Sequence, residues 1–297
     1  MQIFSEPLLI NNRAADDHAS FLSRKDALNW GIEIGTSQRV HPHLFQFGRL
    51  VLPTYGFLVA LGTILSLLVC VRTARLLSLD TDKVWSWALV AIVSGLVGSR
   101  ILLILLNWPR YGVRALTMSL NGTRGPGPAA IAIAVAAGVV YALHLGLPIR
   151  RTADAIAPSL ALGSSILSVG CLEAGCDFGT PTHLPWAVVF TSRAAMPGTP
   201  LGVPLHPTQI YASLVEFLLF VVLLWLVHRP HRDGEILGAW LFLGGLSSFL
   251  LGFLRGDGGS WLAGLVTVTQ LVAAAMVLVG GLLWLHRPQA TQVSHVG

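Results

Sequence analysis

Long apolar stretches, separated by short polar or basic linkers, run through most of this chain. A helix needs roughly 20 mostly apolar residues to cross a bilayer, and seven stretches come close to that length. The pattern therefore predicts an all-α fold, a polytopic transmembrane helical bundle of about seven spans. The expected spans are 50–71, 84–106, 128–147, 154–172, 207–227, 235–254 and 261–286.

The fourth of these stretches, residues 154–172, is the least apolar. Pro158, Gly163 and several serines dilute it. Lipid offers no hydrogen-bond partners, so such a helix is tolerated only where protein covers it. We therefore expect this span to pack against other helices.

The same pattern divides the chain into parts. We expect an extramembrane segment over 1–49, a single transmembrane domain over 50–286 with an extracytoplasmic linker at 173–206, and a cytoplasmic tail over 287–297. The apolar run Pro7 to Ile10 is too short for the core of a secretory signal peptide. The first span is then expected to act as an uncleaved insertion signal.

Basic residues between the spans predict the orientation. The linkers after the first, third and fifth spans are short and basic, and such linkers face the cytoplasm by the positive-inside rule. This places the N-terminus outside and the C-terminus inside. The basic residues of these three linkers are Arg72, Arg75, Lys83, Arg150, Arg151, Arg229 and Arg232.

The composition supports a membrane protein. Hydrophobic residues make up 54% of the chain and charged residues only 11%, whereas a soluble domain carries about 25% charged residues. A net charge of +5 could suggest nucleic acid, but the arginines lie in linkers, where orientation explains them better. We expect the lipid bilayer, and no nucleic acid, as a partner.

A few ionisable side chains fall within the apolar stretches, where charge is costly. Arg100 could hold a lipid phosphate with its planar fork of donors, or it could extend to the membrane interface. Glu216 follows Tyr211 by five residues and could pair with Arg100 or with another buried donor, structurally or functionally. His144, near the end of the third span, is typical of an interfacial histidine.

The stretch from 168 to 190 is rich in glycine and in reactive side chains. A helix is expected to end there in a turn-rich loop that contains Cys171, Cys176 and Asp177. The spacing Cys-x4-Cys is not a recognised zinc pattern, so we expect no metal. The three cysteines, which include Cys70, form neither a disulfide framework nor a CxxC pair.

Two further candidates flank later spans. His206 precedes Pro207, which suits the first turn of a helix, and an imidazole at that surface could act as a base or only cap the helix. Arg255, at the end of the sixth span, could bind a phosphate or be an ordinary flanking charge.

Together these segments resemble the prolipoprotein diacylglyceryl transferase family, in order, over residues 44–257. Each motif alone is weakly specific, and six in order on a seven-span chain are strongly specific. The segments that carry the resemblance are Leu52-Pro53-Thr54-Tyr55-Gly56, Gly98-Ser99-Arg100, Asp154-Ala155-Ile156-Ala157-Pro158, Gly170-Cys171 through Gly179, Pro185-Trp186-Ala187-Val188, and His206-Pro207-Thr208-Gln209-Ile210-Tyr211 with Glu216.

The resemblance implies a reaction and its partners. The family transfers a diacylglyceryl group from phosphatidylglycerol to the lipobox cysteine in the signal peptide of a preprolipoprotein, at the bacterial cytoplasmic (inner) membrane, without a metal or organic cofactor. Arginines suit the lipid phosphate, and a base or polarised tyrosine suits the thiol. The expected catalytic residues are Tyr55, His206 and Tyr211, and the expected substrate-binding residues are Arg100, Arg124, Cys171, Gly179, Glu216 and Arg255.

The chain also departs from the family pattern. Ser168 stands where the family signature has an arginine, and the stretch at 123–127 lacks the family's histidine. Ser248 and Gly252 stand where the family has an arginine and a glutamate. Arg124 could replace a phosphate contact, and His206 could supply the base.

Three hypotheses follow from these residues. The first is an active transferase with a rearranged site. The second is a diverged paralogue that binds lipid without catalysis, or that acts on another thiol or lipid. The third, a transporter or channel, is the weakest, because the spans show no internal repeat and no path of polar residues.

Overall fold

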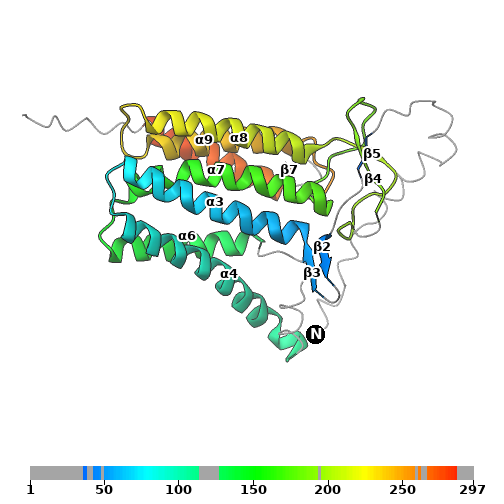
Figure 1. The fold of residues 1–297 in the computed structure, drawn as a ribbon, viewed down its shortest axis with the longest axis horizontal. Coiled ribbons are helices and arrows are strands. Elements are labelled where there is room, and N and C mark those ends of the chain that lie inside the picture. The colour runs from blue at the N-terminus through cyan, green and yellow to red at the C-terminus, as the bar shows by residue number, and fades with distance from the viewer. Residues whose placement is uncertain are drawn as a thin grey trace, which may run out of the picture.

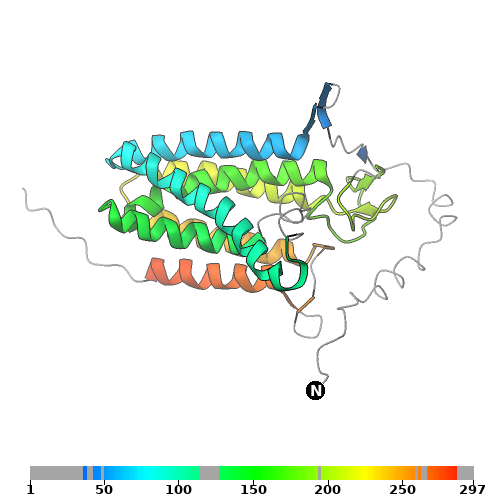
Figure 2. The same cartoon turned by 90° about the horizontal axis from the view of Figure 1, so that it is seen from below.

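Helices occupy all seven predicted spans. The structure is a computed structural model that describes residues 36–38, 43–47, 50–113, 127–192, 195–257, 260–261 and 266–285. The described helices form an antiparallel bundle with short strands gathered at one end (Figures 1 and 2). They are α3 (Thr54–Leu76), α4 (Thr81–Tyr111), α6 (Gly127–His144), α7 (Ile149–Ala174), α8 (Thr208–Val227), α9 (Glu235–Gly252) and α10 (Val268–Leu285).

The first and last helices start later than predicted because short strands occupy the beginning of their apolar stretches, while α7 starts earlier, at Ile149 rather than residue 154, and α4 ends later, at Tyr111 rather than residue 106. The first helix starts at Thr54 rather than at residue 50, since β3 (Leu50–Pro53) pairs with β2 (His43–Phe47). The last helix starts at Val268 rather than at residue 261, since β6 (Ser260–Trp261) pairs with β7 (Val266–Thr267). Apolarity alone does not separate a short strand from the first turns of a helix.

The helices have the length and surface of membrane spans. Six of them, all but α6, are long and apolar enough to cross a bilayer, and α6 has a shorter apolar helix over Ala130–His144. Large apolar side chains point outward from them: Leu106 is 69% exposed, Leu214 64% and Leu278 68%. Such surfaces are stable against lipid rather than water. The protein is a multi-pass membrane protein.

Helix α7 lies in the middle of the bundle. It packs against α3, α8 and α9, while α10 packs on α9 (Figure 1). Helix α4 packs mainly against α6 and diverges from α3 along its length. The expectation that the fourth span is covered by protein is confirmed, because α7 is the most buried of the six long spans.

Asp154, near the start of α7, ties this central helix to α9. Its side chain is fully buried, and its two oxygens accept hydrogen bonds from the backbone N–H groups of Gly234 (2.6 Å) and Leu237 (2.8 Å). These groups belong to the first turn of α9, where N–H groups have no partner within the helix. Asp154 therefore caps a helix that lies 80 residues further along the chain.

The strands lie at the end of the bundle opposite the turns that follow α3, α6 and α8 (Figure 1). In the larger sheet, β4 (Val188–Phe190) lies between β1 (Thr36–Gln38), which is parallel to it, and β5 (Pro204–Leu205), which is antiparallel. Buried Val188, Phe190 and Leu205 form a small core here. This layer fixes the long loop between α7 and α8 over the bundle end.

Gly179 lies where three chain segments cross in this layer. Its N–H donates to the carbonyl of His206 (3.2 Å), and it forms a bridge with Arg255. A β-carbon at this position would lie 2.5 Å from the β-carbon of His206 and 3.0 Å from the carbonyl oxygen of Leu254. Only glycine permits this approach, which brings the segments around residues 179, 206 and 255 together.

We predict that Asp154→Ala destabilises the protein by about 1–3 kcal/mol, because it leaves two buried N–H groups without acceptors. Denaturant unfolding in detergent micelles measures this change. Asp233→Ala is the matched control, since its ion pair with Arg151 is exposed and contributes at most about 1 kcal/mol. Equal losses in the two variants would contradict the capping role.

We predict that Gly179→Ala loosens the strand layer, at a cost of about 1–3 kcal/mol, because the added methyl group displaces backbone rather than a side-chain tip. Faster limited proteolysis between α7 and α8 would report the change. The control is Gly281→Ala on α10, where the nearest atom to a β-carbon lies 3.9 Å away. Unchanged proteolysis of both variants would rule out a crowded crossing at Gly179.

Candidate functional site

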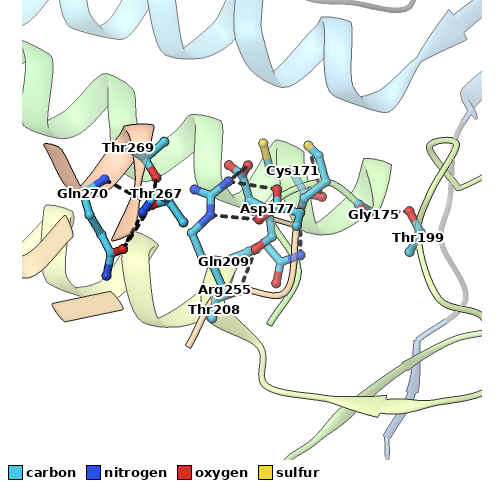
Figure 3. A network of polar contacts seen from close by, with 12 residues as sticks. Cys171, Gly175, Asp177, Thr199, Thr208, Gln209, Arg255, Thr267, Thr269 and Gln270 are labelled. Carbon is cyan, nitrogen blue, oxygen red and sulfur yellow. Dashed lines mark hydrogen bonds and ion pairs between the residues drawn. The ribbon is translucent and has the colours of Figure 1, made fainter. Parts of the chain in front are cut away.

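The candidate site lies at the strand-bearing end of the bundle and begins where α7 ends. Gly175 adopts the left-handed conformation (φ 81°), in which it closes the helix with a hydrogen bond from its N–H to the carbonyl of Cys171 (2.8 Å). Glycine is favoured at such a position because it has no β-carbon. The chain then turns across the bundle end, so that Asp177 lies near Cys171 (Figure 3). The N–H of Cys176 donates to the carbonyl of Cys171 (3.0 Å).

Side chains from distant segments satisfy the carbonyl groups of this turn. Thr199 donates to the carbonyl of Gly175 (2.8 Å), Gln209 to that of Cys176 (2.7 Å) and Thr208 to that of Asp177 (2.6 Å). Figure 3 shows these contacts. Buried backbone carbonyls need partners, so the first residues of α8 hold the turn in place.

Asp177, Arg255 and Asp257 form a charged group beside this turn. Arg255 donates to both oxygens of Asp257 (3.0 and 2.9 Å) and pairs with Asp177. Burial alone would lower the pKa of the Arg255 guanidinium, but hydrogen bonds and negative charge from Asp257 and Asp177 raise it above its ordinary value. Arg255 therefore stays charged, and two carboxylates already compensate its charge.

Trp186, His206 and Tyr211 form a second, aromatic group. The indole N–H of Trp186 donates to the Tyr211 hydroxyl oxygen (2.7 Å), and the rings of His206 and Tyr211 meet edge to face with centroids 6.3 Å apart. His206 Nδ1 is buried and has no hydrogen-bond partner in the described part of the chain. An imidazole nitrogen without a partner can accept a proton or bind a polar substrate group.

Gly179 connects the two groups, since it contacts both His206 and Arg255. Tyr55, at the start of α3, lies on the face of α7 nearby: a β-carbon on Gly170 would lie 3.3 Å from its ring. Tyr55 is also within electrostatic range of Cys171 and Asp177. The structure thus gathers the predicted residues Tyr55, Cys171, Gly179, His206, Tyr211 and Arg255 at one end of the bundle.

The other three predicted site residues are placed differently. Glu216 lies deeper in α8 and faces α9, with one carboxylate oxygen 3.9 Å from the β-carbon position of Gly244. Its other oxygen is buried and has no hydrogen-bond partner among the described residues. Arg100 is half-buried in α4. Arg124 lies outside the described residues.

Two positions that are charged in the family pattern, 168 and 252, carry small uncharged residues here. Ser168 donates to the carbonyl of Ser164 in its own helix (2.9 Å). A β-carbon on Gly252 would lie 2.6 Å from the side chain of Gln270, which is buried and accepts a hydrogen bond from the N–H of Thr267. Gln270 therefore fills the space beside position 252.

Sequence reasoning missed four residues that build the site: Trp186, Thr208 and Gln209, which make the contacts above, and Asp177 as the partner of Arg255. All four are polar or aromatic residues within the segments that carry the family resemblance. Their roles depend on which distant carbonyl or side chain each one meets, and linear spacing does not reveal this.

A small cavity of about 90 Å³ lies between α7 and α8, lined by Val169, Leu172, Gln209, Ile210, Ser213 and Leu214. Pockets that enclose a small molecule measure roughly 300–1,000 Å³. This cavity is therefore not a head-group pocket by itself.

Comparison with known proteins agrees with the motifs. A family model described as prolipoprotein diacylglyceryl transferase matches residues 42–286.

Two relatives are named phosphatidylglycerol–prolipoprotein diacylglyceryl transferase. The one from Clostridium tetani (strain Massachusetts / E88) is 28% identical over 239 residues, which are 80% of this chain and 94% of the relative. The one from Finegoldia magna (strain ATCC 29328 / DSM 20472 / WAL 2508) is 30% identical over 233 residues, which are 77% and 88% of the two chains. The match covers the transmembrane bundle and both groups of the site, and this chain belongs to the prolipoprotein diacylglyceryl transferase family.

Proposed function

We propose that this protein transfers the diacylglyceryl group of phosphatidylglycerol to the lipobox cysteine of preprolipoproteins. The family match over residues 42–286 carries the proposal. Relatives that match most of this chain bear the name of that activity. The gathering of six predicted site residues at one end of a membrane bundle supports it, since both substrates are membrane-bound.

The reaction replaces a C–O bond at one glycerol carbon with a C–S bond. The cysteine sulfur attacks the carbon that carries the phosphate ester, a C–S bond forms, and the C–O bond to phosphate breaks. Glycerol phosphate leaves with the bonding electrons, and the thiol proton passes to a base. The protein must therefore accept the proton that the thiol sulfur loses and stabilise negative charge on the phosphate.

In this proposal His206 takes the thiol proton, and its Nδ1 has no hydrogen-bond partner among the described residues. Tyr211 lies beside it and accepts a hydrogen bond from Trp186, so its own hydroxyl proton remains available to donate to the substrate. Trp186 acts as a positioning residue for Tyr211. Tyr55 lies across α7 from this pair and donates a further hydrogen bond to the lipid head group.

Arg100 and Arg124 are the proposed phosphate contacts. Arg255 is assigned a positioning role in addition to its predicted substrate contact, because Asp177 and Asp257 already compensate its charge. Cys171 and Gly179 line the site between the two groups. Glu216, deeper in α8, keeps its predicted substrate-binding role, and its unpartnered carboxylate oxygen is the proposed contact.

The proposed location is the bacterial cytoplasmic membrane, with the site at its outer face. The basic linkers follow α3, α6 and α8, at the bundle end opposite the strands (Figure 1). The positive-inside rule places these linkers in the cytoplasm. The lipobox lies next to a signal peptide, so an outer site meets it after insertion of the precursor.

We predict that the purified full chain, reconstituted with phosphatidylglycerol and a lipobox peptide, forms a thioether-linked diacylglyceryl peptide and releases glycerol phosphate. Mass spectrometry of the peptide measures the product. A lipobox peptide with serine in place of cysteine is the negative control. Product no greater than in that control would refute the proposal and favour a diverged paralogue without this activity.

We predict that His206→Ala and Tyr211→Phe each lower the rate by about 10²–10³-fold, the usual effect of losing a proton-transfer group or a transition-state donor. Tyr55→Phe and Arg100→Ala are expected to lower it as well. Rates come from the same assay at saturating peptide. His144→Ala and Tyr141→Phe are matched controls, since this stacked pair lies at the opposite end of the bundle. A loss shared by the controls would mean that the site assignment is wrong.

A further inference from the structure

The end of α7 brings two cysteines into contact. The carbonyl of Cys171 accepts hydrogen bonds from the N–H groups of Gly175 (2.8 Å) and Cys176 (3.0 Å). The second bond joins the N–H of one residue to the carbonyl of the residue five positions earlier, which is a common way for a helix to end. The side chains of these two residues are frequently in contact. In most proteins that contact is hydrophobic. Here both side chains are thiols.

The geometry of this turn suits a disulfide. The Cys176 sulfur lies 3.7 Å from the Cys171 carbonyl oxygen, so the Cys176 side chain turns back toward residue 171. A backbone hydrogen bond between the two residues is consistent with the roughly 4.4–6.8 Å that a disulfide spans between Cα atoms. Both cysteines are free in this structure.

The two thiols differ in access. Cys171 is buried, with 6% of its surface exposed, whereas Cys176 is half-buried at the end of the turn. Cys70, the third cysteine, is buried in a separate apolar cluster with Ala74 and Val84. An external reagent therefore meets Cys176 first, and Cys171 is in position to react next.

We propose that Cys171 and Cys176 form a redox-active pair that closes to an intramolecular disulfide by exchange with an external disulfide. The Cys176 thiolate attacks one sulfur of the external disulfide and releases one thiolate. Cys171 then passes its proton to the thiolate already released, and its sulfur attacks the Cys176 sulfur of the mixed disulfide and releases the second thiolate. The pair loses two electrons and two protons, and the external disulfide becomes two thiols.

The surrounding contacts allow closure without rearranging the fold. Thr199 and Gln209 hold the carbonyls of Gly175 and Cys176, so the backbone of the turn is already fixed. The proposed closure moves the two side chains and leaves this backbone in place. This end of the bundle is the one that the orientation prediction places outside the cytoplasm, where disulfides form and persist.

The test uses the full chain in detergent micelles, with Cys70→Ala so that only the pair can react. Oxidised glutathione is the probe, and intact-mass spectrometry is the readout. We expect the pair to lose two hydrogens and to retain no glutathione. Adding Cys171→Ser should trap one glutathione on Cys176, and adding Cys176→Ser should leave the native protein unmodified.

The same samples unfolded in denaturant should all react, which shows that the reagent is active. Cys171→Ala provides a second trapping variant in case serine disturbs the buried position. Two free thiols in the folded pair, or a lasting glutathione adduct on it, would overturn the proposal. Reaction of Cys171 in the folded Cys176→Ser variant would overturn the order of attack. Transferase activity plays no part in the readout, so this result is independent of the proposed function.

Discussion

The structure depends on hydrogen bonds that tie the two ends of α7 to segments far away in the chain. This helix carries a proline, several serines and a buried carboxylate, and such a helix cannot face lipid, which satisfies no polar group. At one end Asp154 caps α9, and at the other end Thr199, Thr208 and Gln209 satisfy the carbonyls of the closing turn. Because α7 is fixed at both ends, α3, α8 and α9 can pack around it.

The candidate site is a product of that anchoring. Thr208 and Gln209 form the first turn of α8, and their hydrogen bonds to the α7 turn set the position of His206 and Tyr211 next to them. Gly179 then crosses between His206 and Arg255, where no larger residue fits. The aromatic group and the charged group thus belong to one layer, although they come from four separate parts of the sequence. The motif from His206 to Tyr211, which is predicted to be catalytic, therefore also has a structural role through Thr208 and Gln209.

The positions at which this chain lacks the family's charged residues have a consistent physical pattern. Ser168 satisfies its hydroxyl within its own helix, and the glycine at position 252 makes room for Gln270. A buried carboxylate oxygen of Glu216 has no hydrogen-bond partner among the described residues. In the same layer, Arg255 is held by the carboxylates of Asp177 and Asp257.

The sequence by itself determined the bundle, because the length and apolarity of each stretch fix a spanning helix locally. It also determined that the polar span needed protein around it, and its motifs pointed to the family and to most of the residues at the site. Only the tertiary structure decided that Asp154 caps α9, that Trp186 holds Tyr211, that Glu216 faces α9, and that Arg255 is paired with Asp177. These outcomes depend on which distant groups meet, and spacing along the chain carries no such information. The Cys171–Cys176 contact lies between the two cases: the spacing alone suggested no pair, but the helix ending at Gly175 brings the two thiols together.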